Sequence, residues 1–340
     1  MCHPDSAIYY RALSSGVPQT RLIAMNFRYS WRLDRALEIV RFCRRHAIQV
    51  IAVRSSRDAR LCLPSFIAGV PIVRFKHIQS PTRRTLTYRF GCNRVVATSA
   101  EIAQELSEKG IPQQRIVVID EGVDLTEFSP GKKPKYLLRE FGITEDVPVV
   151  MNIGMLRPDK GQLHFLNSIK HVLGKVPHAK IFIVGGKVDD GSINQRLNEY
   201  VAEHDLQDSV VLTGYRNDVA ELTRLADIVI LSSLVEAQSR IIPQAFATKR
   251  PVIATNVGGI PELVIHNQTG VLVPPANSSA LAKAIIKMLE NPAFSHELAC
   301  NGYEFAKQNL CFITMMNKIV AMYSSVLPNA KKTSLLHKSP

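Results

Sequence analysis

The sequence has no long apolar run. No stretch of its 340 residues approaches the roughly 18 consecutive apolar residues that a membrane-spanning helix needs. The first residues, MCHPDSAIYYRAL, have neither the apolar core nor the cleavage site of a secretory signal peptide. Hydrophobic residues make up 46% of the chain and charged residues 21%, which is typical of a globular protein. We therefore expect a folded protein without a membrane span or a secretory leader.

Paired cysteines are also missing. The six cysteines are scattered and no two have Cys-x-x-Cys spacing, which favours neither a zinc site nor a disulfide framework and indicates a reducing compartment. No Gly-x-Gly-x-x-Gly segment follows a predicted strand, which argues against a nicotinamide-dependent dehydrogenase. Trp31 is the only tryptophan and no aromatic platform motif is present, so nucleic-acid binding would depend on charge alone.

Acidic residues are scarce in one part of the chain. Residues 1–100 contain 17 Lys and Arg against 4 Asp and Glu, whereas residues 101–340 contain 25 of each kind. The formal net charge of +13 therefore comes from the first hundred residues. Such a one-sided charge attracts an anionic partner such as membrane lipid, nucleic acid or a phosphorylated acceptor. The alternative is a basic protein that its charge keeps soluble.

Short β-branched runs alternate with stretches of helical periodicity. Because the predicted strands are apolar, this alternation favours an α/β fold with parallel sheets covered on both faces. The predicted strands are Gln49–Val53, Pro71–Phe75, Asn93–Thr98, Ile116–Ile119, Pro148–Ile153, Lys180–Val184, Ser209–Leu212, Asp227–Leu231, Pro251–Thr255 and Gly270–Val273. The predicted helices are Asp34–His46, Ala100–Lys109, Gln162–Leu173, Ile193–His204, Asn217–Leu225, Ser278–Leu289 and Ala293–Gln308.

A segment rich in Pro, Gly and charge divides the strands into two groups. We predict a first domain at 1–130, a linker at 131–147, a second domain at 148–308 and a C-terminal helix at 309–327 that returns to the first domain. The expected architecture is two Rossmann-like, doubly wound domains that face each other across a cleft, with ligands bound beyond the strand ends. Because residues 3–6 are already turn-like, we expect the first domain to lack its usual initial strand and Gly-rich loop.

Three segments after predicted strands are suited to a phosphorylated ligand. Arg157 and Lys160 follow the strand MNIG, where a forked guanidinium, a point charge and a helix N-terminus would meet a diphosphate. In the second segment Glu236 would accept hydrogen bonds from sugar hydroxyls and Gln244 would reach a ribose. In the third, GGIPELV at 258–264, a tight turn lets backbone approach a ligand. The alternatives are solvated surface cations, an ordinary helix start and a plain strand-to-helix turn.

Together these segments resemble the C-terminal domain of family-4 retaining glycosyltransferases of the GT-B fold. That family carries G-R-L-x-x-x-K-G, E-G-F-G-x-x-x-x-E-A, G-G-x-P-E and G-x-L-V-x-P in this order. The chain has GMLRPDKG (154–161), EAQSRIIPQAFATKRPVIAT (236–255), GGIPELV (258–264) and GVLVPP (270–275). The resemblance covers residues 148–308 and extends more weakly to GVDLTEFSP (122–130). It implies transfer of a sugar from a nucleotide-sugar donor, with retention at the anomeric carbon.

The resemblance also implies roles for single residues. Lys160 matches the lysine that contacts the donor diphosphate. Met155 stands where the family has Arg, and we expect Arg157 to supply that cation. Glu236 matches the Glu that contacts the transferred sugar, and Gln244 replaces the Glu that contacts the ribose.

Two further positions follow from the same comparison. Ala237-Gln238-Ser239 replaces the Gly-Phe-Gly of the family, so we expect the Ser239 hydroxyl and the nearby backbone N–H groups to contact a phosphate. His77 matches a first-domain histidine that faces the sugar; its alternative is a strand-end histidine bonded to backbone. The resemblance thus assigns catalysis to His77 and Glu236, and donor binding to Arg157, Lys160, Gln238, Ser239, Arg240 and Gln244.

The implied reaction needs no metal cofactor. Asp189-Asp190 does not form an Asp-x-Asp triplet, and no cluster of His, Asp and Glu has the spacing of metal ligands. The implied acceptor is a glycan or a lipid-linked molecule, in cell-envelope polysaccharide or lipopolysaccharide synthesis. Two alternatives remain open: a truncated, non-catalytic or merely nucleotide-sugar-binding protein, and a nucleotide-sugar epimerase of the same fold.

Arginines recur every three to four residues near the N-terminus. On a helix over residues 31–46 they would gather on overlapping faces. We expect this surface to dock on the anionic cytoplasmic leaflet of the plasma membrane, which makes the protein cytoplasmic and peripheral. Apolar contact would come from Trp31, Leu33, Leu37 and Phe42, and the alternative is that Leu33, Leu37, Val40 and Phe42 pack on the sheet. The arginines are Arg28, Arg32, Arg35, Arg41, Arg44 and Arg45.

Overall fold

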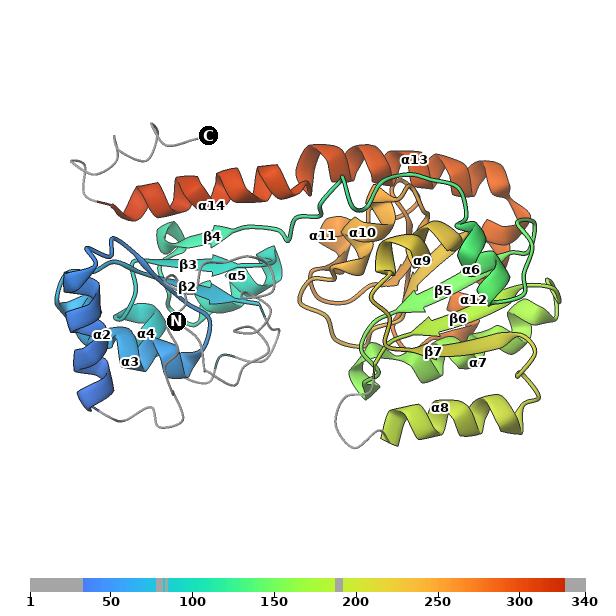
Figure 1. The fold of residues 1–340 in the computed structure, drawn as a ribbon, viewed down its shortest axis with the longest axis horizontal. Coiled ribbons are helices and arrows are strands. Elements are labelled where there is room, and N and C mark those ends of the chain that lie inside the picture. The colour runs from blue at the N-terminus through green and yellow to red at the C-terminus, as the bar shows by residue number, and fades with distance from the viewer. Residues whose placement is uncertain (1–32, 78–81, 83–84, 187–191, 328–340) are drawn as a thin grey trace.

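The computed structural model describes residues 33–77, 82, 85–186 and 192–327, which form two parallel sheets side by side along the long axis (Figure 1). All ten predicted strands are confirmed, because each predicted range overlaps an observed strand; the strands Ile72–Lys76 and Val210–Gly214 end one and two residues beyond their predicted ranges. The first sheet has the order β1 (Ile51–Val53), β2 (Ile72–Lys76), β3 (Arg94–Ala97), β4 (Ile116–Val118). The second has the order β10 (Val271–Val273), β9 (Val252–Thr255), β8 (Ile228–Leu231), β5 (Val149–Ile153), β6 (Lys180–Val184), β7 (Val210–Gly214).

Helices cover both faces of the first sheet. Side chains of α2 (Leu33–Arg45), α3 (Ser56–Ile67) and α5 (Ala100–Glu108) form one core with the strands, to which Tyr88 of α4 (Leu86–Arg89) belongs. The opposite face packs against α14 (Phe312–Val326) through Val73, Phe75 and Met322.

Helix α2 packs on the first sheet, but not through all of the apolar residues that the alternative interpretation assigned to this contact. Ala36, Ile39 and Cys43 are its buried residues, at a spacing of three to four, whereas Leu33 is 76% and Leu37 50% exposed. These two leucines therefore do not pack on the sheet, since they lie on the side of the helix away from it. Arg28, Trp31 and Arg32 lie outside the described ranges. The expected loss of the initial strand and Gly-rich loop also concerns residues outside these ranges.

The second sheet also has a core on each face. One core contains side chains of α7 (Gln162–Leu173), α8 (Ser192–Glu203) and α12 (Ser278–Glu290). The other contains side chains of α6 (Lys135–Glu140), α9 (Val219–Leu225), α10 (Ile241–Ala247) and α11 (Ile260–Leu263). Helix α13 (Pro292–Asn309) contributes to both cores, through Leu298 and Ala306.

The segment 131–147, which we predicted as a linker, contains helix α6. Leu137 and Leu138 are buried in the core of the second sheet, together with Ile143. Lys133 donates hydrogen bonds to the carbonyls of Glu145 and Val147. The Pro and Gly residues of this segment thus lie on both sides of a helix, and the apolar side chains of that helix join the core of the second sheet.

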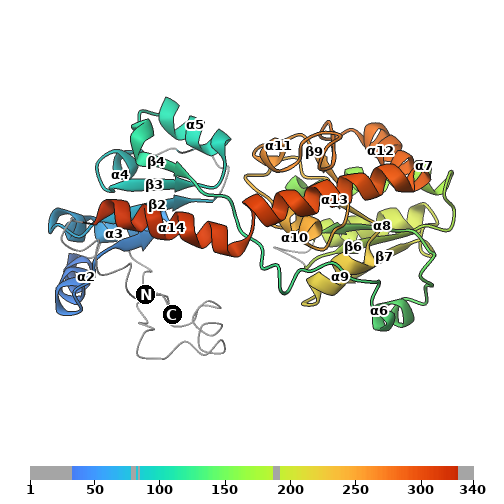
Figure 2. The same ribbon diagram turned by 90° about the horizontal axis from the view of Figure 1, so that it is seen from above.

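Within the described ranges, the chain crosses between the two sheets twice, and the crossings lie side by side. The N–H of Val123 donates to the carbonyl of Leu310 at 2.7 Å, and the N–H of Phe312 donates to the carbonyl of Val123 at 2.9 Å. Helix α13 lies along the second sheet and α14 continues along the first, as Figure 2 shows from above. Helix α14, the last described helix, therefore packs back on the first sheet.

Candidate functional site

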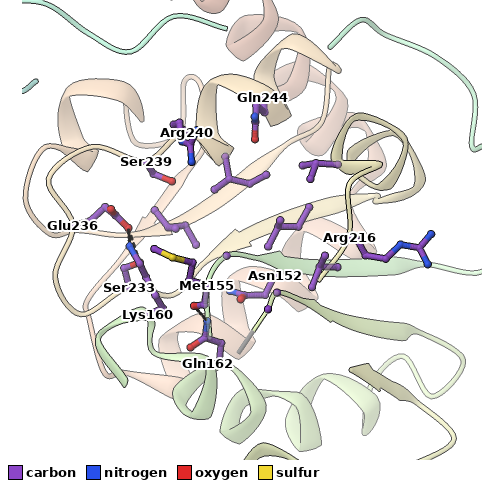
Figure 3. A pocket seen from close by; sticks show the side chains of 18 of the residues that line it. Asn152, Met155, Lys160, Gln162, Arg216, Ser233, Glu236, Ser239, Arg240 and Gln244 are labelled. Atoms are coloured by element: carbon purple, nitrogen blue, oxygen red, sulfur yellow. Dashed lines mark hydrogen bonds and ion pairs between the residues drawn. The ribbon is translucent and has the colours of Figure 1, made fainter. Parts of the chain in front are cut away.

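A pocket opens beyond the carboxyl ends of the second sheet, where the order of the strands reverses. Strand β5 lies between β6 and β8, so the loops that follow β5 and β8 leave the sheet beside each other. Crevices of this kind bind ligands in open α/β sheets. The pocket has a volume of about 440 Å³ and is drawn in Figure 3. Its polar lining includes Glu121, Asn152, Lys160, Gln162, Arg216, Ser233, Glu236, Gln238, Ser239, Arg240 and Gln244.

Lys160 and Glu236, predicted from separate motifs, meet in this pocket. The Nζ of Lys160 lies 2.6 Å from Oε2 of Glu236, which also accepts a hydrogen bond from the hydroxyl of Ser233 at 3.0 Å (Figure 3). The two side chains are only 18% and 11% exposed, so the attraction is screened little by water. The pair places one cation and one carboxylate at the wall of a cavity that could hold a phosphate and a sugar.

The two loops that carry this pair are fixed against each other. The N–H of Leu234 donates to the carbonyl of Asp159 at 2.7 Å, and the hydroxyl of Ser232 donates to the carbonyl of Lys160 at 2.9 Å. Gly161 has φ +66°, and a Cβ there would lie 2.1 Å from the carbonyl oxygen of Ser232. Only glycine permits this approach, so the K-G pair of the motif sets the position of the lysine.

Four of the five remaining predicted donor-binding residues line this pocket, and three of them are described first. Gln244 on α10 and Ser239 line the cavity, and Ser239 is buried. Arg240 also lines the cavity; its guanidinium is highly exposed, with Nε 3.8 Å from Oε2 of Glu121. Ser239 and Arg240 directly precede α10 and Gln244 lies within it, and all three line the same cavity as Lys160 (Figure 3).

Gln238 lines the pocket but its amide is engaged elsewhere. Its Nε2 donates to Oδ1 of Asp120 at 3.0 Å, and its Oε1 accepts from the N–H of Glu121 at 2.8 Å. Both partners follow β4 of the first sheet. In this conformation the side chain of Gln238 therefore connects the two sheets.

Arg157 is not among the residues that line the pocket. Its Nε is 2.9 Å from Oδ1 of Asp159, two positions along the same loop. Met155, where the family motif has Arg, lines the pocket and is half exposed. The expected replacement of the missing cation by Arg157 is thus not visible in this conformation, because a nearby carboxylate already pairs with the guanidinium.

His77 follows β2 in the first sheet and is not among the lining residues of this pocket. Its ring stacks on Phe75, with centroids 5.7 Å apart. Its Nε2 is buried and has no hydrogen-bond partner in the described part of the chain. Burial lowers the pKa of His77, and the nearby positive charge of Arg54 lowers it further. The ring therefore favours its neutral form.

Several pocket residues were not predicted. Glu121 follows β4 and reaches the pocket from the first sheet; burial raises its pKa, while Arg240 and Arg54 oppose the shift. Tyr215 and Arg216 follow β7, and Arg216 is paired with Glu140 and Asp218. Their positions directly after predicted strands were the available signal.

Two buried amides of the wall were also missed. Asn152, a polar residue in the apolar strand β5, donates to the carbonyl of Ile230 at 3.1 Å and to the hydroxyl of Ser232 at 3.2 Å. Gln162 donates to the carbonyl of Met155 at 3.0 Å. Gln162 thus holds backbone of the loop that carries Lys160, and Asn152 joins β5 to the end of β8, directly before the loop that carries Glu236.

No group of three or more possible metal ligands occurs within the described ranges. Asp189 and Asp190 lie outside these ranges. Every helix of the described part is too short or too polar to cross a bilayer.

Comparison with known sequences places the chain in a family. A sequence model described as "Glycosyl transferases group 1" matches residues 136–305, half of the chain, and one described as "Glycosyltransferase Family 4" matches residues 4–127. The protein therefore belongs to the group 1 glycosyltransferases of family 4.

Individual relatives agree with this assignment. The chain is 27% identical over 241 residues to "N-acetyl-alpha-D-glucosaminyl L-malate synthase" of Bacillus anthracis, covering 70% of this chain and 61% of the relative. It is 24% identical over 233 residues to "UDP-Gal:alpha-D-GlcNAc-diphosphoundecaprenol alpha-1,3-galactosyltransferase" of Escherichia coli, covering 66% of this chain and 58% of the relative. The matched region thus spans about three fifths of the length of each of these curated relatives.

The fold is GT-B. The structure of Anabaena Alr3699/HepE in complex with UDP-glucose superimposes with a TM-score of 0.82 at 22% identity, over 94% of this chain and 90% of that chain. At this identity the likeness concerns the fold, and it extends over both sheets.

Proposed function

We propose that the protein is a glycosyltransferase that moves a sugar from a nucleotide-sugar donor to an acceptor with retention of anomeric configuration. The observation that carries this proposal is the contact between Lys160 and Glu236 in the pocket at the strand reversal. Family membership supports it, as does the similar fold of Anabaena Alr3699/HepE, whose structure was solved in complex with UDP-glucose. The residues around the pair supply hydroxyl, amide and guanidinium groups suited to a sugar nucleotide.

The proposed chemistry assigns a task to each member of the pair. Departure of the nucleoside diphosphate builds negative charge on its phosphate oxygens, which the ammonium of Lys160 would stabilise. The carboxylate of Glu236 would accept hydrogen bonds from hydroxyls of the transferred sugar and orient it. His77, on the first sheet, would face the sugar from the acceptor side after the donor has bound.

The proposed acceptor is a glycan or a lipid-linked molecule of the cell envelope. One relative is named for a diphosphoundecaprenol acceptor, which is a lipid. Helix α2 presents Leu33 and Leu37 to solvent beside the exposed Arg41, Arg44 and Arg45. Cationic and apolar side chains together are the combination that binds anionic membrane interfaces. We therefore propose peripheral attachment to the cytoplasmic leaflet as part of the same function.

Product analysis tests the reaction. The protein is incubated with a panel of nucleotide sugars and candidate acceptors, and products are identified by mass spectrometry, with NMR of the new glycosidic bond. A product with the donor's anomeric configuration supports the proposal, and an inverted linkage contradicts retention. A new nucleotide sugar without acceptor would identify an epimerase.

A thermal-shift panel separates an inactive protein from an enzyme whose acceptor was missing. Stabilisation by one class of nucleotide sugar identifies the donor, because a ligand that binds only the folded chain raises Tm. The Glu236→Gln variant should keep this shift but lose about tenfold or more in turnover, since it retains the shape and loses the charge. Absence of any shift with every donor would support a non-catalytic remnant.

A further inference from the structure

The loop that carries Glu236 is attached to the first sheet by the residue two positions further on. Gln238 uses both ends of its amide: Nε2 donates to Asp120 and Oε1 accepts from the N–H of Glu121. The N–H partner fixes which end of the amide is the oxygen, so the pairing has one orientation. Ala237, between Glu236 and Gln238, is buried in the core of the first sheet.

Two ion pairs lie next to the Gln238 amide, one formed by Asp120 and one by Glu121. Oδ2 of Asp120 lies 3.4 Å from Nζ of Lys318 on α14, and Glu121 lies 3.8 Å from Arg240. Both pairs are partly exposed, so each contributes little on its own. The two hydrogen bonds of Gln238 therefore set the geometry of the contact.

A second contact comes from the segment after β9, which comprises a short loop and helix α11. The carboxylate of Glu262 accepts from the N–H groups of Ala100 and Glu101, at 2.8 and 3.2 Å, at the start of α5. A Cβ on Gly259 would lie 2.7 Å from Cβ of Ser99, so the two backbones approach closely there. The loops after β8 and β9 thus meet the loops after β4 and β3.

We propose that Gln238 is a positioning residue that couples nucleotide binding in the pocket to contact between the two sheets. The inference rests on the proposed function of the pocket. Glu236 is held by Lys160 on one side, and Gln238, two residues later, is held by the first sheet on the other. Separation of the sheets therefore pulls on the loop that forms the sugar and phosphate side of the pocket. A nucleotide that orders this loop in turn stabilises the contact.

Hydrogen–deuterium exchange of the full chain tests the contact without any ligand. Gln238→Ala should raise deuterium uptake at Glu121, because it removes the acceptor of that N–H. It should also raise uptake at Ala100 and Glu101, because weaker contact between the sheets lets their hydrogen bonds to Glu262 open more often. Gln207→Ala, an exposed glutamine in the turn after α8, is the matched control and should change neither. Higher uptake at Glu121 alone would mean that Gln238 acts only locally and would overturn the coupling.

A paired substitution guards against simple misfolding. In Gln238→Glu the new carboxylate faces Asp120, and the repulsion should open the contact at neutral pH. Adding Asp120→Asn supplies an amide donor in place of the acceptor, so the double variant should restore protection at Glu121, Ala100 and Glu101. Failure of the double variant to restore protection, while the single variant still folds, would contradict the proposed pairing.

UDP is the probe for the coupling. Calorimetry should show UDP binding weakened roughly tenfold in Gln238→Ala, corresponding to about one or two net hydrogen bonds, and restored in the double variant. UDP should also lower uptake at Ala100 and Glu101 in the unmodified protein. Loss of UDP affinity with unchanged exchange would make Gln238 a direct donor ligand instead. Absence of UDP binding in every variant would count against the donor site, while the exchange data would still decide whether the contact exists.

Discussion

Lys160 is the pocket residue whose replacement should affect donor binding most directly. Lys160→Ala should weaken UDP binding by about 10- to 100-fold, since a hydrogen bond to a charged group contributes about 1.5–3 kcal/mol. Lys170→Ala, an exposed lysine in the last turn of α7, is the control. Calorimetric titration of both variants is the measurement, and equal affinities would remove Lys160 from the diphosphate site. Melting curves should accompany it, because the alanine also leaves Glu236 without its partner.

His77 gives a prediction about pH. Burial lowers its pKa below 6.5 in the folded protein, so the unfolded chain binds the proton more tightly. Stability contributed by the neutral ring is present above pH 6.5 and is lost as pH falls through 6.5 toward the lower folded value. His77→Asn should therefore flatten the decline of Tm between pH 7.5 and 5, relative to the unmodified protein. His178→Asn, at an exposed position, should leave the decline as it is, and identical slopes for all three would contradict a buried neutral His77.

At the scale of loops and helices, Gly161 tests how firmly the two pocket loops are joined. Gly161→Ala should destabilise the protein and weaken UDP binding, because its Cβ would collide with the carbonyl of Ser232. Gly142→Ala is the matched control: it has φ +61° but nothing within 4 Å of an added Cβ. Backbone strain of about 1–2 kcal/mol is common to both variants. Urea unfolding should show a larger loss for Gly161, and equal losses would mean that the loops separate easily.

Sequence periodicity was sufficient for the strands and the long helices, because buried β-branched runs and apolar stripes are local signals. It missed α3, which contains Pro64 and two arginines, and α4, whose four residues are too few to show a helical period. Helix α6 was hidden inside Pro- and Gly-rich sequence. These elements are held by contacts with residues distant in the chain, which a local pattern does not contain.

The pocket was predicted in part for a similar reason. Lys160, Glu236 and Gln244 belong to motifs with fixed spacing, and the structure brings them together. Glu121 comes from the other sheet, and the two bonds of Gln238 depend on how the sheets meet. The pairing of Arg157 with Asp159 depends on the conformation of one loop. Such features follow from the arrangement of the whole chain and have no counterpart in the motif.

At the scale of the whole molecule, the uneven charge and the exposed side of α2 lead to the last prediction. Arg41, Arg44 and Arg45 lie exposed on α2, which carries two solvent-facing leucines. Each basic residue near an anionic leaflet contributes about 1 kcal/mol, and salt screens this attraction. The protein should therefore sediment with anionic phosphatidylglycerol vesicles at low salt, and much less with neutral phosphatidylcholine vesicles or at high salt.

Substitution of these three arginines by Gln should reduce binding to anionic vesicles by up to about 100-fold. The control removes three exposed lysines of the second sheet's helices and loops, Lys170, Lys175 and Lys283, and so lowers the net charge equally. If both triple variants lose binding to the same extent, net charge alone attracts the vesicles and α2 is not the docking surface. If binding of the unmodified protein is indifferent to lipid charge and salt, the acceptor is better sought among soluble glycans, and the basic residues of the first hundred positions serve another partner.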